Sequence, residues 1–125
     1  MILDTNALSA FADGAPELAP MIEAAAPIAI PVVVLGEYRY GITHSSRSRH
    51  YQAWLADFVP SCRVLPITEE TTHWYAEVRS ELRKAGRPIP SNDFWIAALS
   101  RQHKLPVLSR DGHFDRVSGL RRVAW

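Results

Sequence analysis

Short apolar runs alternate along this chain with longer stretches in which apolar residues recur every three or four positions. Runs of the first kind indicate strands, and the three-to-four spacing indicates amphipathic helices. Strands are predicted at residues 2–3, 28–30, 63–65, 106–108 and 121–125, the last of them at a sheet edge. Helices are predicted at residues 6–11, 17–26, 31–41, 45–58, 69–85 and 91–103.

The predicted helix starts carry residues that cap free backbone N–H groups. Asn6, Thr68 and Ser91 each stand where a polar side chain is favoured before the first turn. Gly86 is a suitable stop for the helix whose buried stripe ends at Ala85.

Strands that alternate with helices are typical of an α/β protein. We expect a three-layer α/β/α sandwich with a mainly parallel sheet, built as one domain over residues 1–125. In such sheets ligands bind beyond the carboxyl ends of the strands. Asp4 and Asp111 directly follow predicted strands, so this edge is the first candidate for chemistry.

Composition excludes several classes of protein. The hydrophobic share of 47% and charged share of 22% are those of a globular domain. The apolar stretch at residues 24–36 holds two prolines and is shorter than the roughly 20 residues of a membrane span. Asp4 interrupts the first apolar run, unlike a signal peptide, so we expect a cytoplasmic protein. A net charge of +1 and a single cysteine, Cys62, argue against a generally basic surface, disulfides and cysteine-bound metals.

Four acids lie in apolar surroundings: Asp4, Glu37, Asp93 and Asp111. Each one alone is explained by a helix dipole, a turn cap or an ion pair. Together, four carboxylates repel one another unless a cation holds them, and clustered oxygen ligands suit Mg²⁺ or Mn²⁺. A hard divalent ion in such a pocket indicates a phosphodiesterase that needs no protein nucleophile.

Four motifs carry a resemblance to a known family. They are MILDTN at residues 1–6, IPVVVLGEYRYG at 30–41, IPSNDFWIAA at 89–98 and LSRD at 108–111, with the acids 33, 56 and 18 residues apart. In this order they resemble the PIN-domain ribonucleases of the VapC toxin type, and the resemblance extends to the closing GLRRVAW.

The resemblance implies that Asp4 and Asp93 bind Mg²⁺ or Mn²⁺ directly, and that Glu37 and Asp111 complete the acidic pocket directly or through water. One or two metal ions remain possible.

Three further residues enter through the same resemblance. Thr5 and Asn6 match polar residues that orient metal-bound water. Asp115 competes with Asp111 for the fourth acidic position, and we favour Asp111 because it follows the predicted strand more closely.

The implied function is that of a metal-dependent endoribonuclease toxin that forms a homodimer. It implies hydrolysis of RNA phosphodiester bonds by metal-activated water and neutralisation by an antitoxin. An arginine of the antitoxin tail is suited to the acidic groove. The RNA target stays unassigned. Residues considered for RNA contact, with solvated faces or core packing as the ordinary alternative, are Tyr38, Arg47, Arg49, His50, Trp74, Arg79, Arg83, Lys84, Arg87 and Trp95.

Two other functions remain open at this stage. A phosphoacceptor receiver domain has a similar size, an acidic pocket and a late lysine such as Lys104, but its acceptor follows an apolar strand, and Asp57 lies in a helical pattern. A catalytically inactive PIN-like binding module keeps the four acids for an arginine-bearing partner and shows no metal-dependent cleavage.

Overall fold

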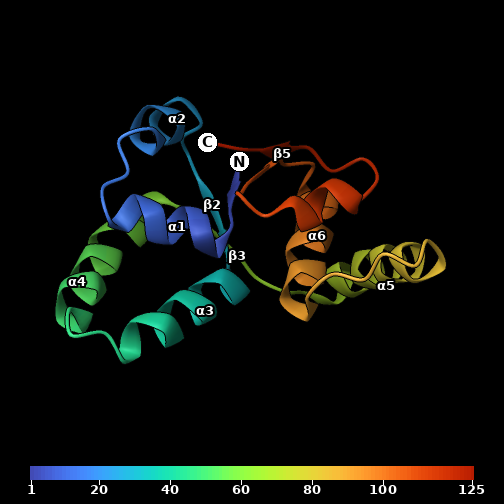
Figure 1. Ribbon diagram of the computed structural model, residues 1–125, viewed down its shortest axis with the longest axis horizontal. Coiled ribbons are helices and arrows are strands. Elements are labelled where there is room, and N and C mark those ends of the chain that lie inside the picture. Colours follow the sequence, from blue (N-terminus) through green and yellow to red (C-terminus); the bar gives the residue numbers. More distant parts are fainter.

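The computed structural model describes residues 1–125 and contains a five-stranded sheet in the order β3-β2-β1-β4-β5, with every pair of neighbours parallel (Figure 1). This confirms the predicted α/β class, and it places the last strand at a sheet edge as expected. The strands are β1 (Ile2–Leu3), β2 (Ala29–Pro31), β3 (Arg63–Leu65), β4 (Val107–Leu108) and β5 (Arg122–Val123).

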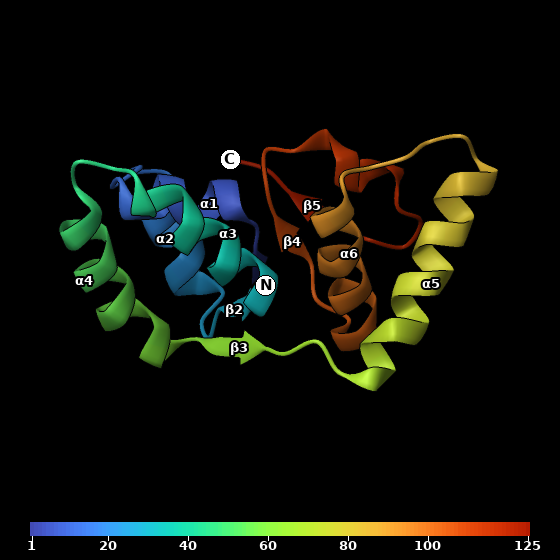
Figure 2. The ribbon, with the colours of Figure 1, turned by 90° about the horizontal axis from the view of Figure 1, so that it is seen from below.

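Six helices surround this short sheet. In Figures 1 and 2, α1 to α4 gather in one half of the molecule, α5 and α6 lie in the other, and the strands run between the two groups. The helices are α1 (Thr5–Ala12), α2 (Leu18–Ala24), α3 (Val32–Thr43), α4 (Ser48–Phe58), α5 (Glu69–Lys84) and α6 (Ser91–His103), with 3₁₀ turns η1 (Val59–Ser61) and η2 (Gly112–Arg116).

The order of the strands creates a switch point beside β1. The chain leaves β1 for β2 and β3 on one side, and returns to add β4 and β5 on the other. Ile2 therefore pairs with Ala29 on one flank and with Val107 on the other. Ligands of open parallel sheets bind at such a point, beyond the carboxyl ends of the strands.

Two predicted helix caps are wrong. The N-cap of α1 is Asp4, whose carboxylate accepts a hydrogen bond from the Thr5 backbone N–H, so Asn6 lies inside the helix. The N-cap of α6 is Pro90, whose carbonyl accepts from the Asp93 N–H, while Ser91 is the first helical residue. Proline sets an extended backbone here and the cap carries no side-chain hydrogen bond.

The cap of α5 agrees with its prediction. Thr68 forms a capping box in which its side chain and that of Thr71 each satisfy the other residue's backbone. In the same helix, Val78 and Leu82 are buried, but Ala85, the expected end of the buried stripe, is exposed because the helix ends at Lys84 and turns away at Gly86. The left-handed φ of +65° at Gly86 is a conformation that suits glycine.

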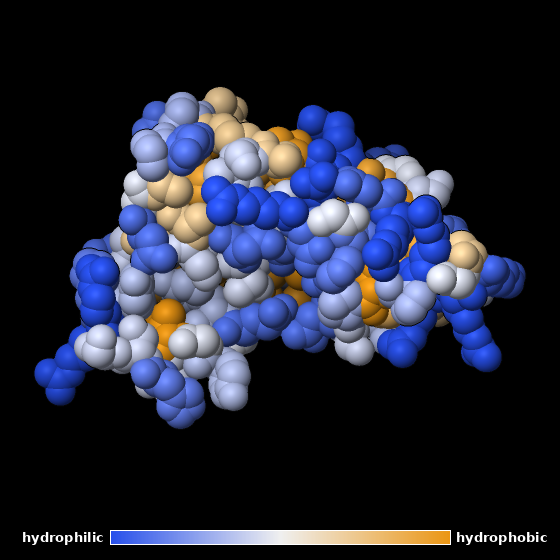
Figure 3. Space-filling model, in the orientation of Figure 1, coloured by the Kyte–Doolittle hydropathy of each residue, from blue (hydrophilic) through white to orange (hydrophobic).

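The main core joins the sheet to α1 to α4 and also includes Ile96 and Leu99 of α6 and Phe114 of η2, and a smaller core lies between α5 and α6. Ile2, Leu3, Val107 and Leu108 have no exposed surface, so both strands of the switch point are fully buried. On the surface, hydrophilic side chains cover most of the face in Figure 3, with apolar colour broadest near α2. None of the helices combines the length and apolar character that crossing a membrane requires.

Phe114 anchors η2, the segment that follows Asp111, because its ring is fully buried in the main core. We expect Phe114→Ala to lower the free energy of unfolding by about 3–5 kcal/mol, through lost apolar burial and the cavity left behind. Urea denaturation measures the change. The control Tyr40→Ala removes a ring that is 73% exposed, and it should stay within about 0.5 kcal/mol of the parent protein. Equal losses in the two variants would contradict the assignment of Phe114 to the core.

Candidate active site

Asp4 lies where the central strand β1 meets helix α1, and it is 5% exposed. Its Oδ1 accepts from the Thr5 backbone N–H at 2.8 Å. Its Oδ2 accepts from Asn6 Nδ2 at 3.0 Å and from Ser109 Oγ at 2.6 Å. No lysine or arginine forms an ion pair with this carboxylate. Burial raises the pKa of Asp4, and the hydrogen bonds from Ser109 and Thr5 only partly offset that effect.

Ser109 connects the ends of β1 and β4, and the sequence reading missed it. Besides donating to Asp4, its hydroxyl accepts from Asn6 Nδ2 at 3.1 Å and from the Asp111 backbone N–H at 2.9 Å. Asn6 adds a second link, because its Oδ1 accepts from the Arg110 N–H at 3.2 Å. The polar residue immediately after an apolar strand was the available signal for Ser109. These bonds position Asp4 and Asp111 relative to each other.

Asp93 faces the same region from the first turn of α6, and its side chain is only 12% exposed. Burial, followed by the negative charge of Asp4, raises the pKa of Asp93 to about 6. Asp111 adds to this effect, whereas a hydrogen bond with His113 opposes it. Asp93 is therefore a carboxyl group held in a place that disfavours its charge.

His113 is the second residue that the sequence reading missed. Its Nδ1 lies 2.9 Å from Asp111 Oδ1 and 3.3 Å from Asp93 Oδ2. The ligand atoms of these three residues all lie within 4.8 Å of one another. His113 follows Asp111, a predicted site acid, by two residues. This was only a weak signal in the sequence, because none of the histidines has a recognised metal-ligand spacing.

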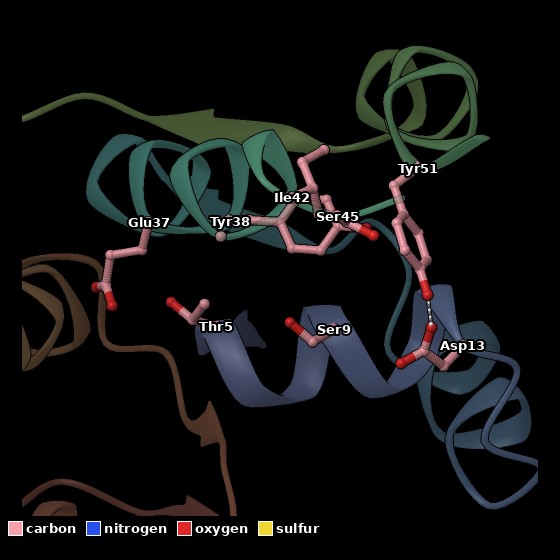
Figure 4. A pocket seen from close by; sticks show the side chains of 9 residues that line it. Thr5, Ser9, Asp13, Glu37, Tyr38, Ile42, Ser45 and Tyr51 are labelled. Atoms are coloured by element: carbon pink, nitrogen blue, oxygen red, sulfur yellow. Dashed lines mark hydrogen bonds between the residues drawn. The ribbon is translucent and has the colours of Figure 1, made fainter. Parts of the chain in front are cut away.

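Glu37 reaches the site from α3. Burial raises the pKa of Glu37, the Asn92 side chain works against that rise, and the charge of Asp4 adds to it. Asn92, next to Asp93 in sequence, is thus a third polar neighbour that the sequence reading missed. Figure 4 shows Glu37 directed toward Thr5 of α1. The buried Thr5 hydroxyl has no partner at ordinary hydrogen-bond distance, although it lies near enough to Glu37 to work against the rise in the Glu37 pKa.

The structure thus brings the four predicted acids into one electrostatically coupled region. Asp93 and Asp111 stand close enough to share His113, while Asp4 and Glu37 lie outside that tightest group and interact through charge. The donors are almost all oxygen atoms, and the buried Thr5 hydroxyl next to them is unpartnered. This donor set fits a hard divalent cation such as Mg²⁺ or Mn²⁺.

Asp115 does not join these acids. Its two carboxylate oxygens bind Arg122 Nε and Nη2, each at 2.8 Å, and this pairing lowers the pKa of Asp115. Asp111 instead caps η2, with its Oδ1 accepting from the His113 N–H at 2.9 Å. The geometry therefore favours Asp111 over Asp115 as the fourth acid of the region.

Several residues considered for RNA contact have partners within the protein. Arg79 lies over the rings of Tyr75 and Phe94, at 5.6 and 5.0 Å from their centroids. Trp95 stacks on Tyr75 at 3.9 Å between centroids. Tyr38 is buried in the core.

Asp57 lies in α4, and its side chain is exposed. It does not follow a strand, as the phosphoacceptor of a receiver domain must. The receiver alternative is therefore wrong.

Comparison with known proteins agrees with this geometry. The PIN-domain family matches residues 1–120. Ribonuclease VapC5 of Mycobacterium tuberculosis is 29% identical over 126 residues, covering 98% of this chain and 90% of the relative. The tRNA(fMet)-specific endonuclease VapC of Shigella flexneri is 31% identical over 97 residues, covering 77% and 74%. The crystal structure of VapBC2 from Rickettsia felis bound to a promoter DNA fragment matches with a TM-score of 0.91 at 26% identity, covering 99% of this chain and 97% of that one.

This chain therefore belongs to the PIN-domain family and is of the VapC type. The family, the fold class and the endoribonuclease toxin function expected from the sequence are confirmed.

The raised pKa of Asp93 predicts how stability depends on pH without divalent metal. Because folding moves this pKa from 3.8 to about 6, the folded state binds more protons between these values, and unfolding free energy rises as pH falls through that window. At pH 7, Asp93→Asn should therefore raise the unfolding free energy, by up to about 3 kcal/mol for a shift of this size.

Urea denaturation at pH 5 and pH 7, with a chelator present, tests this expectation. His103, whose pKa is lowered by burial, changes stability in the opposite direction, so the difference between parent and Asp93→Asn is the quantity to measure. That difference should be larger at pH 7 than at pH 5. A variant less stable than the parent at pH 7 would mean that Asp93 serves as the structural partner of His113.

Proposed function

We propose that this VapC-type endoribonuclease depends on Mg²⁺ or Mn²⁺ held by Asp4, Asp93, Glu37 and Asp111. The observation that carries the proposal is the raised pKa of the buried Asp4 and Asp93 and of the half-buried Glu37, in a region where no lysine or arginine pairs with them. Ordinary ion pairs lower carboxyl pKa values, whereas these three are raised. A divalent cation supplies the missing positive charge.

A bound divalent ion supplies Lewis-acid polarisation of a phosphoryl oxygen and lowers the pKa of water that it binds. Residues of this chain orient the carboxylates that would hold the ion. Ser109 and Asn6 hold the Asp4 carboxylate in one orientation. His113 contacts both Asp93 and Asp111, and the unpartnered Thr5 hydroxyl is free to orient water.

The proposal extends to partners. VapBC-5 of Mycobacterium tuberculosis, a structure similar to this chain, is a member of the VapBC family of toxin-antitoxin systems, and we propose that this chain likewise binds a cognate antitoxin. An arginine from such a partner suits the unpaired carboxylates. We further propose a homodimer that acts in the cytoplasm, where RNA substrates are found. The catalytically inactive binding module would keep the same acids without cleavage, and the similarity to ribonucleases disfavours it.

Replacing one acid distinguishes the metal-dependent endoribonuclease from the inactive binding module. We expect Asp93→Asn to lower metal-dependent RNA cleavage by about 100-fold or more while the protein stays folded, because the amide keeps the shape and removes a ligand charge. The matched control is Asp57→Asn, the same change on the exposed face of α4, which should leave activity unchanged.

The same two variants are followed by thermal unfolding with added Mn²⁺. The parent and Asp57→Asn should gain melting temperature by mass action, and Asp93→Asn should gain much less. Cleavage that persists in EDTA, or an Asp93→Asn protein with normal turnover, would remove the metal from the proposal. Metal binding without cleavage of any RNA would favour the inactive module.

A second pair of variants tests which late acid belongs to the site. Asp111→Asn should lower both cleavage and the Mn²⁺-induced rise in melting temperature, because Asp111 lies beside Asp93. Asp115→Asn should leave metal binding unchanged, since it breaks only an exposed pair with Arg122. The reverse result would exchange the two assignments.

A further inference from the structure

A pocket of about 270 Å³ lies between α1 and α3, beside the acid cluster (Figure 4). Thr5 and Glu37 belong both to this pocket and to the surroundings of the acids. The remaining lining residues have no part in the proposed metal centre. They are Ser9, Asp13, Tyr38, Gly41, Ile42, Ser45 and Tyr51.

The pocket follows one face of α1. Thr5, Ser9 and Asp13 are spaced four residues apart, so they lie on the same side of the helix. At 1.5 Å per residue they span about 12 Å. The far end is closed by the Tyr51 hydroxyl, which donates to Asp13 Oδ1 at 2.6 Å. The pocket is therefore a short trench that begins at the acids and ends at this hydrogen bond.

Tyr38 gives this trench an unsatisfied polar group. Its side chain is buried, with the residue 3% exposed, and its hydroxyl has no hydrogen-bond partner. Burial and the nearby Asp13 and Tyr51 raise the pKa of Tyr38 to about 12, so its hydroxyl remains a proton donor and lies toward the far end. Buried hydroxyl groups nearly always have a partner, and an exception points to a ligand or water.

The chemistry of the lining limits what the trench can bind. The two charged groups, Glu37 and Asp13, are acids, and no lysine or arginine lines the pocket, so a phosphate group is disfavoured. Hydroxyls from Thr5, Ser9 and Ser45 can donate and accept hydrogen bonds. This combination suits a neutral ligand that is rich in hydroxyl and amino groups.

Tyr51 adds an aromatic surface at the far end. Its ring is oriented by the hydrogen bond to Asp13 and by Arg47, whose guanidinium lies 5.3 Å from the ring centroid. Unpaired RNA bases stack on such rings. A length of about 12 Å is suited to one ribose and its base, with the ribose nearest the acids.

We propose that the trench is a nucleoside subsite, which holds the ribose and base of the nucleotide next to the scissile phosphate. The inference rests on the proposed function, because it takes the acids as the place of cleavage. Asp13 is the specificity-determining residue: its Oδ2 accepts no hydrogen bond within the protein and is available to a base amino group. Adenine, cytosine and guanine carry such a group, and uracil does not.

Gly41 provides a way to fill the trench without disturbing the acids. A Cβ added at Gly41 meets no atom within 4 Å, and the residue lines the pocket, so Gly41→Leu places a side chain in the trench. Gly36 is the matched control. It lies in the same helix, has equally open space and does not line the pocket. Both replacements favour the helix, so both proteins should fold.

Nucleoside binding is measured directly on the ¹⁵N-labelled protein by NMR, so the result does not depend on cleavage. Adenosine, cytidine and guanosine should shift the amide signals of Ser9 and Tyr51 in a saturable way, uridine should do so more weakly, and inorganic phosphate should not. Gly41→Leu should abolish these shifts and Gly36→Leu should keep them. The inference is overturned if no nucleoside binds, or if phosphate alone gives the same shifts.

Cleavage of a randomised single-stranded RNA pool, followed by sequencing of the ends, tests the position of the subsite. The parent and Gly36→Leu should prefer amino-bearing bases at one position beside the cut. Gly41→Leu should lose that preference with at least a tenfold fall in kcat/KM, and Asp13→Asn should alter it. All variants should keep the Mn²⁺-induced rise in melting temperature. If Gly41→Leu keeps the base preference of the parent protein, the subsite is overturned. The same result is expected if the trench binds a peptide of a partner protein instead of a nucleoside.

A parent protein that binds nucleosides but cleaves no RNA would contradict the proposed function and leave the nucleoside site standing.

Discussion

The buried carboxylate of Asp4, at the end of the central strand, is the constraint on which the site depends. It is held by neutral donors alone: a backbone N–H of its own helix, the Asn6 amide and the Ser109 hydroxyl. Because Ser109 is 105 residues away in the chain, this contact joins the first and fourth strands at their carboxyl ends. Hydrogen bonds from neutral groups orient a carboxylate but do not neutralise it, so burial still raises its pKa.

The other acids of the site are also left without a lysine or arginine that would neutralise their charge. Two arginines near Asp111 are engaged elsewhere: Arg122 pairs with Asp115, and Arg110, next to Asp111 in sequence, lies over the ring of Trp125. His113 alone bridges Asp93 and Asp111. The fold therefore keeps several carboxylates in a region that disfavours their charge, at a cost in stability. Such a cost is common at functional sites, where activity requires an arrangement that is not the most stable one. A cation or a charged partner relieves it.

Helices α1 and α3 serve two neighbouring places. At one end Thr5 and Glu37 border the acids, and toward the other end Asp13 and Tyr38 line the trench. Helical periodicity explains how the same two helices line both places, since residues four apart on a helix share a face and form a continuous row. Chemistry on a phosphate and recognition of the adjoining nucleoside can thus be arranged along the same two helices.

Much of the fold was readable from the sequence because it depends on local patterns. Apolar runs and helical spacing located all five strands and six helices, and acids in apolar surroundings at Asp4, Glu37, Asp93 and Asp111 indicated the region of the site. Those features reflect burial, which each segment encodes in its own residues.

The tertiary structure alone decided how these segments meet. The pairing of β1 with β4 brings Ser109 to Asp4, the turn of η2 sends Asp115 to Arg122 while Asp111 stays beside Asp93, and the approach of α1 to α3 forms the trench. A tertiary contact also bears on the cap of α1, which is Asp4 and not Asn6. The Asn6 amide instead donates a hydrogen bond to Ser109, the residue that follows β4. The residues that meet in these contacts lie from 7 to 105 positions apart, and local periodicity carries no information about their partners.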